Sequence, residues 1–211
     1  MIRLTFYILV TLLGIINAYA QNSEYEKGMQ KAFELWQQQK TSEASNLFER
    51  IANAEEENWI PYYYTAYINT IYSFGEKDAA KHHAQLEKAQ LYVDKAFGIS
   101  KNNPELIVLQ ALIHTAWIAF DGQTYGMALS GKTNQLYREA LAIAPENPRV
   151  LLSYAEWNMG SARFFGKDTT PYCKDVEKAL QLFVTFKEET PFYPSWGKSR
   201  AEEVLASCKV E

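Results

Sequence analysis

The sequence contains few of the residues that build most catalytic and metal sites. Its 211 residues include three histidines and two cysteines. His82 and His83 are adjacent and would point apart on a helix, so they cannot bind one metal ion together. No Ser-His-Asp, Cys-His or paired-carboxylate arrangement is recognisable. We therefore expect a protein without catalytic residues, metal ligands or a cofactor.

The sequence also lacks a block of basic residues. Its 21 Lys and Arg face 25 Asp and Glu, which gives a net charge of −4. Nucleic acids and anionic membrane surfaces attract proteins with a concentrated positive charge. We therefore expect neither of them as the main partner.

Long apolar runs are missing beyond the N-terminus. The single run follows Arg3 and precedes Ala18-Tyr19-Ala20, which is the pattern of a secretory signal peptide. A membrane anchor is the alternative, but the run is shorter than the roughly 20 residues that span a bilayer. We expect a signal peptide over residues 1–20, with cleavage between Ala20 and Gln21.

The remaining chain, residues 21–211, is long enough for one domain with an ordinary core. Cleavage of the signal peptide would leave a periplasmic or secreted protein that is not stably inserted in a membrane.

A Leu-aromatic pair recurs along the chain. It begins at Leu47, Leu91, Leu136 and Leu182, so that successive pairs are 44, 45 and 46 residues apart. Periods of roughly 20 to 50 residues are typical of stacked helical hairpins, in which each hairpin buries its apolar face against the next.

Capping residues divide each period into two helices. Asn103-Pro104 and Asn147-Pro148 each place a capping side chain before a proline at the first helical position. The sequence predicts helices and no strand, with helices over residues 24–39, 42–56, 61–74, 78–100, 104–120, 125–144, 148–164, 171–189 and 196–208. We therefore expect an all-α fold, an α-solenoid of about four helix pairs with a C-terminal capping helix.

The two cysteines fit this arrangement. Cys173 begins one predicted helix and Cys208 ends the next. If the two helices form an antiparallel hairpin about a turn at residues 190–195, both sulfur atoms lie at the same end. We expect a disulfide between them in an exported protein, with two free thiols or a redox pair as the alternative.

These segments resemble the tetratricopeptide-repeat (TPR) superfamily. The stretches from Leu136 to Pro148 and from Leu91 to Pro104 are similar to the second helix of a TPR and the proline that follows it. The last 80 residues or so also resemble exported TPR-like proteins of Gram-negative bacteria that have no assigned activity. The matching segments are Asn147-Pro148-Arg149-Val150, Phe164-Phe165-Gly166-Lys167, Ala179-Leu180, Leu182-Phe183 and Pro194-Ser195-Trp196-Gly197, followed by Cys208.

One motif matches a nucleotide-binding pattern. Gly126 to Thr133 satisfies G-x-x-x-x-G-K-[ST], which requires a loop between a strand and a helix. Helical periodicity continues on both sides of the motif, so we expect a helix there and no nucleotide site.

Tyrosines are concentrated in the predicted helix 61–74. The resemblance to TPR stacks implies that the first helix of each pair lines a concave surface. Candidates for a groove that binds a peptide or glycan are Tyr63, Tyr67, Phe74, Asn158 and Arg163. Packing between helices is the alternative for each tyrosine.

The sequence therefore favours an exported, non-catalytic interaction module that binds an unidentified protein or peptide partner on its concave face. The alternative is a cell-envelope enzyme, or an accessory subunit, that acts on peptidoglycan or polysaccharide. A cleft holding two carboxylates with raised pKa values would favour this alternative. A purely structural subunit would instead expose a large apolar patch.

Overall fold

The computed structural model describes residues 24–208. The expected signal peptide and its cleavage site lie outside these residues. Regular structure in the described part is entirely helical. A first helix covers residues 24–37, and it is followed by α2 (Thr41–Ala54), α3 (Trp59–Ser73), α4 (Ala79–Ile99), α5 (Pro104–Phe120), α6 (Gly122–Ile143), α7 (Pro148–Phe164), α8 (Thr170–Thr185) and α9 (Lys198–Ser207).

The five helices from α3 to α7 begin at short polar side chains. The side chains of Asn58, Asn103 and Asn147 accept hydrogen bonds from backbone N–H groups in the first turns of α3, α5 and α7. Asp78 and Asp121 do the same for α4 and α6. Each cap gives a partner to an N–H group that has none within the helix. The spacing of the caps therefore sets the repeat.

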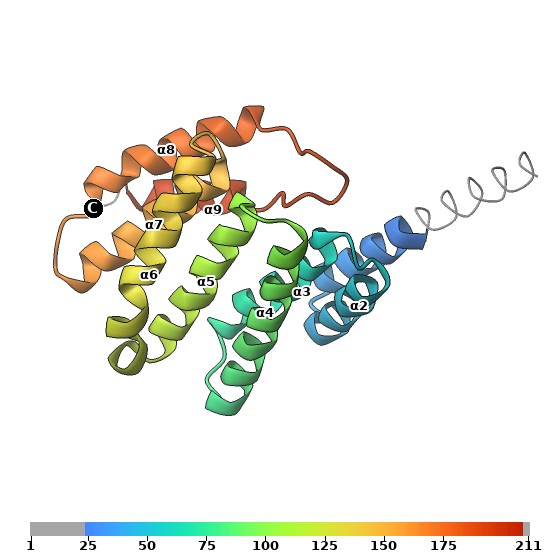
Figure 1. The fold of residues 1–211 in the computed structure, drawn as a ribbon. Coiled ribbons are helices and arrows are strands. Elements are labelled where there is room, and N and C mark those ends of the chain that lie inside the picture. Colours follow the sequence, from blue (N-terminus) through green and yellow to red (C-terminus); the bar gives the residue numbers. More distant parts are fainter. Residues whose placement is uncertain (1–23, 209–211) are drawn as a thin grey trace, which may run out of the picture.

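The helices form four pairs followed by α9 (Figure 1). The pairs are 24–37 with α2, α3 with α4, α5 with α6, and α7 with α8. Helices α3, α5 and α7 contact one another as well as their partners, so they form a continuous inner row. Apolar side chains between successive pairs build the core. The predicted all-α solenoid with a C-terminal capping helix is confirmed for the described residues.

Several helix ends differ from the sequence prediction. Helix α3 begins at Trp59, so that Pro61 lies inside its first turn. A proline is tolerated there because the N–H group that it lacks would have no intrahelical partner. Helix α6 begins at Gly122, directly after α5, because Asp121 both follows α5 and caps α6.

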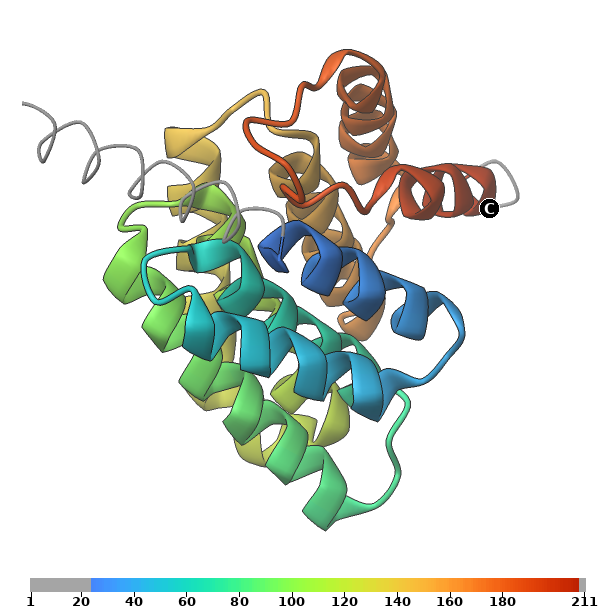
Figure 2. The same cartoon turned by 90° about the vertical axis from the view of Figure 1, so that its right-hand side faces the viewer.

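The largest difference lies between α8 and α9. The predicted helix 171–189 ends at Thr185, and a non-helical segment, residues 186–197, replaces the expected short turn. This segment leaves α8, runs toward the N-terminal helices and returns to α9 (Figures 1 and 2). Pro191 and Pro194 disfavour helical backbone in the residues before them. Gly197 has φ +113°, where a Cβ atom would lie 2.6 Å from the Phe183 ring, so glycine is required there.

Aromatic side chains fix the 186–197 segment to the first helix and to α3. The Phe192 ring stacks on Phe33 and meets Tyr25 edge-on, and its backbone holds a positive φ of 62°. The Tyr64 hydroxyl donates to the backbone oxygen of Tyr193 (3.4 Å). Burial of these rings explains why the segment does not continue as helix.

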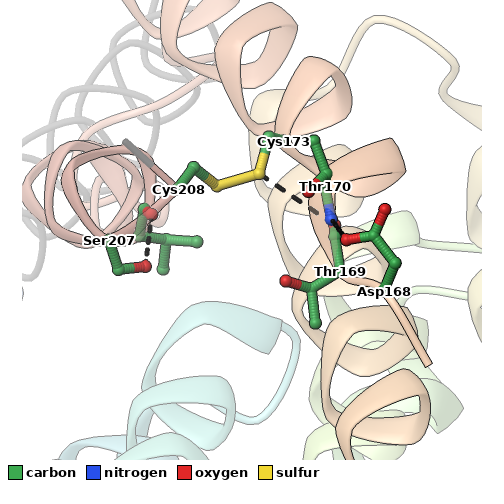
Figure 3. The surroundings of a disulfide bond; sticks show 7 residues. Asp168, Thr169, Thr170, Cys173, Ser207 and Cys208 are labelled. Carbon is green, nitrogen blue, oxygen red and sulfur yellow. Dashed lines mark hydrogen bonds between the residues drawn. A yellow bond between two sulfur atoms is a disulfide. The ribbon is translucent and has the colours of Figure 1, made fainter. Parts of the chain in front are cut away.

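The predicted disulfide is present. Cys173 near the start of α8 is bonded to Cys208, the residue that caps the end of α9, and their Cα atoms lie 6.1 Å apart (Figure 3). The turn before Cys173 is ordered by the Thr170 N–H, which donates to the Asp168 carboxylate (2.9 Å). The bond ties the capping helix to the last pair although the connection between them is long.

None of the helices within residues 24–208 combines the length and the apolar composition that a membrane span requires.

Candidate functional site

The surface of interest is the face of α3, α5 and α7 that the C-terminal part of the chain contacts. We call it the inner face. Equivalent positions are counted from the capping asparagines of the three helices. They are Tyr67 and Ile71 on α3 with Phe74 directly after it, Leu112, Ala116 and Ala119 on α5, and Glu156, Gly160 and Arg163 on α7. Trp196 stacks on Tyr67, and Arg200 of α9 bonds Glu156, so both ends of the row face the C-terminal segment.

The first half of the inner face is filled by the chain itself. The Trp196 indole N–H donates to the Tyr63 hydroxyl (2.6 Å), and the Trp196 ring stacks on Tyr67 at 5.0 Å. Tyr63 is fully buried and Tyr67 is 8% exposed. Burial raises the phenol pKa of both tyrosines. Tyr63, a predicted groove residue, is therefore a core residue.

The second half of the inner face is open. Exposure rises along α3, from 8% at Tyr67 to 36% at Ile71 and 45% at Phe74. Ala119 on α5 and Gly160 on α7 are also exposed. A Cβ atom at Gly160 would meet nothing within 4 Å. The open part thus has apolar and aromatic side chains on α3 and small residues on α5 and α7.

Charge gathers at the α7 side of this surface. The Arg200 guanidinium contacts the Glu156 carboxylate at 2.7 Å and 2.8 Å and Glu203 at 3.2 Å. Burial raises the pKa of Glu156, while the charges of Arg200 and Arg163 act in the opposite direction. Arg163, a predicted groove residue, thus lies at the open inner face with its positive charge close to Glu156. Because Glu156 is already paired with Arg200, it is a poor candidate for a catalytic acid.

Asn158 lies elsewhere. Its position after the helix cap matches those of Asn69 and His114. Asn69 donates to Ser45 of α2 (2.9 Å), and His114 lines a pocket between α4 and α6. These residues face the second helices of the pairs, so the register places Asn158 outside the inner face, contrary to the expectation from the sequence. Asn158 is two positions after Glu156, a step that turns a side chain to another side of the helix.

Some residues of the surface were missed in the sequence. The sequence predicts a helix start at Trp196, and nothing in the sequence around Ala119 or Gly160 indicates a surface that binds a ligand. The density of aromatic residues in Pro191-Phe192-Tyr193-Pro194-Ser195-Trp196 was a usable signal, because a solvated turn rarely holds three rings.

The nucleotide-binding pattern has no structural support. Gly126 to Thr133 lies within α6, where the backbone is helical throughout. The described residues also contain no group of three or more His, Cys, Asp or Glu side chains arranged to hold a metal ion.

The fold is an α-solenoid of paired helices, and its own C-terminal segment fills part of the inner face. The sequence matches no protein-family model and no curated protein. Among solved structures, the HusA haemophore from Porphyromonas gingivalis is similar, with a TM-score of 0.76, 23% identity, and coverage of 88% of this chain and 92% of that chain. This likeness shows a shared fold over nearly the whole length.

A thermophilic TPR protein from Thermus thermophilus is also similar, with 14% identity and coverage of 89% of this chain and 100% of that chain. Its TM-score of 0.41 is lower than that of the haemophore.

Proposed function

We propose that this chain is an exported, non-catalytic binding protein that holds haem, or another planar tetrapyrrole, on the open part of its inner face. The observation that carries the proposal is the combination of exposed Ile71 and Phe74 with the small, exposed residues Ala119 and Gly160 on the next two helices of the row. Sites for flat organic ligands are lined by apolar and aromatic side chains with a few polar groups at the edge.

The chemistry of a tetrapyrrole matches this arrangement. Its ring has two apolar faces. One of them can lie beside the aromatic stack that Tyr67 and Trp196 form. Its carboxylates would lie at the α7 side, beside Arg163 and Arg200. An arginine has five N–H donors and can bind more than one carboxylate. The fold shared with a haemophore supports this choice of ligand over other aromatic molecules.

The proposed site also explains why the filled half of the inner face does not prevent binding. The ligand takes the surface beyond Trp196, where exposure rises toward the ends of α3, α5 and α7. A periplasmic or secreted location is part of the proposal, because the disulfide between Cys173 and Cys208 fits an oxidising compartment.

The test is a titration of the purified protein with haemin, followed by the haem absorbance band, beside the variant Gly160→Leu. A leucine at this exposed helical position is favourable for the helix by roughly 0.8 to 1 kcal/mol, so the fold is kept. The side chain would occupy the place of the ring. Such overpacking costs about 1 to 3 kcal/mol, so haemin affinity should fall by about 5- to 150-fold.

Gly98→Leu is the matched control, since Gly98 is also exposed, helical and free of neighbours within 4 Å, but lies on α4. It should bind haemin as the unchanged protein does. Metal-free protoporphyrin, titrated in parallel, shows whether the iron contributes. Equal haemin affinity for both variants would place the site elsewhere, and no binding to the unchanged protein would refute the function.

A protein partner is the second candidate function. Phe164 and Phe165, at the end of α7, are 82% and 66% exposed and meet edge-to-face at 5.1 Å. Adjacent exposed aromatic residues are costly in water and are common where proteins dock. They lie next to Arg163, so a partner at this tip would also reach the open inner face. This candidate becomes the leading one if haemin does not bind.

A further inference from the structure

An open pocket lined mostly by polar residues lies away from the inner face, between α4 and α6, with α5 at its base. Its volume is about 490 Å³, which is within the usual range for small-molecule sites. Among the described residues that line it, Leu136 is the one apolar side chain, and the others are amides, an imidazole and two opposite charges. Such a lining is unsuited to a tetrapyrrole, so the pocket needs another ligand.

The two charges stand at opposite ends of the pocket. Lys132 and Glu139 both belong to α6 and are two helical turns apart, which corresponds to about 10 Å along the axis. Gln135 lies between them on the same face. A ligand that reaches both charges must therefore be elongated and must carry a negative group at one end and a positive group at the other.

The base of the pocket is built from fixed polar groups. The Gln90 and Gln110 side chains donate to each other, both at 2.8 Å, which holds the two amides in place. The Nδ1 atom of His114 is buried and has no hydrogen-bond partner among the described residues. Burial, and then the charge of Lys132, lower the pKa of His114, so its imidazole is neutral at pH 7. His114 lines the pocket, so its imidazole can take part in a ligand's hydrogen bonds.

We propose that this pocket binds a short peptide of about three residues with free termini. An extended chain spans about 3.3 to 3.6 Å per residue, so the two ends of a tripeptide match the separation of Lys132 and Glu139. The terminal carboxylate lies at Lys132 and the terminal ammonium at Glu139. Its peptide groups bond the Gln110 amide and the His114 imidazole at the base of the pocket.

The test is calorimetric titration of the purified protein with Ala-Ala-Ala, N-acetyl-Ala-Ala-Ala and Ala-Ala-Ala-amide. Lys132→Gln and Glu139→Gln should each weaken the binding of Ala-Ala-Ala by up to about fivefold, as expected for loss of one exposed ion pair. Acetylation should weaken binding to the unchanged protein but not to Glu139→Gln. Amidation should weaken binding to the unchanged protein but not to Lys132→Gln.

Lys174→Gln and Glu177→Gln, on the exposed side of α8, are the matched controls and should bind Ala-Ala-Ala normally. Circular dichroism checks that every variant is folded. The proposal is overturned if Ala-Ala-Ala does not bind at millimolar concentration, or if the pocket variants bind it as the controls do. Haemin titration of Lys132→Gln should be unchanged, so this result is independent of the proposed haem site.

Discussion

At the scale of single residues, the most consequential pair is Glu105 with Arg149. The two side chains are fully buried, and the Arg149 guanidinium donates to both Glu105 carboxylate oxygens at 2.7 Å and 2.8 Å. Asn147 donates a further hydrogen bond to the same carboxylate (2.6 Å), and the Phe186 ring lies 4.6 Å from the guanidinium carbon. The pair thus joins α5, α7 and the 186–197 segment at one point.

Arg149→Met should destabilise the protein by about 3 to 5 kcal/mol, because the Glu105 carboxylate is left buried without its countercharge. The double variant Glu105→Leu with Arg149→Met should lose less, since both charges are removed together. Urea unfolding of the two variants measures the difference. An equal loss of unfolding free energy in both variants would mean that other groups compensate the buried Glu105 charge, which would contradict this prediction.

Neither partner of this pair was recognisable in the sequence. Glu105 and Arg149 each follow the proline at the start of a predicted helix, a place where charged residues are usually solvated. Their burial depends on Phe186 and Tyr193, which come from the far end of the chain. The caps beside them, Asn103 and Asn147, were predictable because a cap acts within three residues of itself.

At the scale of the elements, the disulfide decides how α9 is held. Helix α9 buries only a narrow stripe, Ala201 and Val204, against α7 and α8. The 12 residues from 186 to 197 that precede it are not helical, so they do not continue α8 into α9. The bond between Cys173 and Cys208 therefore restricts an element that packing alone secures weakly.

Replacing both cysteines by serine should lower the free energy of unfolding by about 3 to 4 kcal/mol in the chain-entropy model, since the bonded residues are 35 positions apart. Urea unfolding of the oxidised protein and of the double variant measures this change. The reduced unchanged protein is the control and should behave as the double variant does. A double variant as stable as the oxidised protein would show that α9 is held by packing.

The pairing of the two cysteines was predictable although the connection between their two helices was not. Their placement at the outer ends of successive helices requires only an antiparallel hairpin, which survives the shortening of α8 to Thr185. The predicted turn at residues 190–195 failed because tertiary contacts of Tyr193 and Trp196 outweigh local helix preference.

At the scale of the molecule, the 186–197 segment connects repeats that are not neighbours in the solenoid. Repeats in a solenoid contact only their sequence neighbours, so its ends can unfold independently. Here Trp196 packs on the core of the first helices and on the core between α5 and α7. Its bond to Tyr63 joins residues 133 positions apart. The period and the caps predicted the stack, but no local pattern contains a contact of this range.

Trp196→Ala should therefore uncouple the unfolding of α3 from the unfolding of α7. Removal of a large, partly buried ring costs about 3 kcal/mol, and the loss falls on the contact that couples α3 to α7. Hydrogen exchange followed by mass spectrometry at increasing urea should show α3 and α7 losing protection at the same concentration in the unchanged protein and at different concentrations in the variant. Phe164→Ala, which removes an 82% exposed ring, is the control and should keep one transition. If the Trp196 variant also unfolds in one step, the sequential contacts of the solenoid suffice to couple its ends.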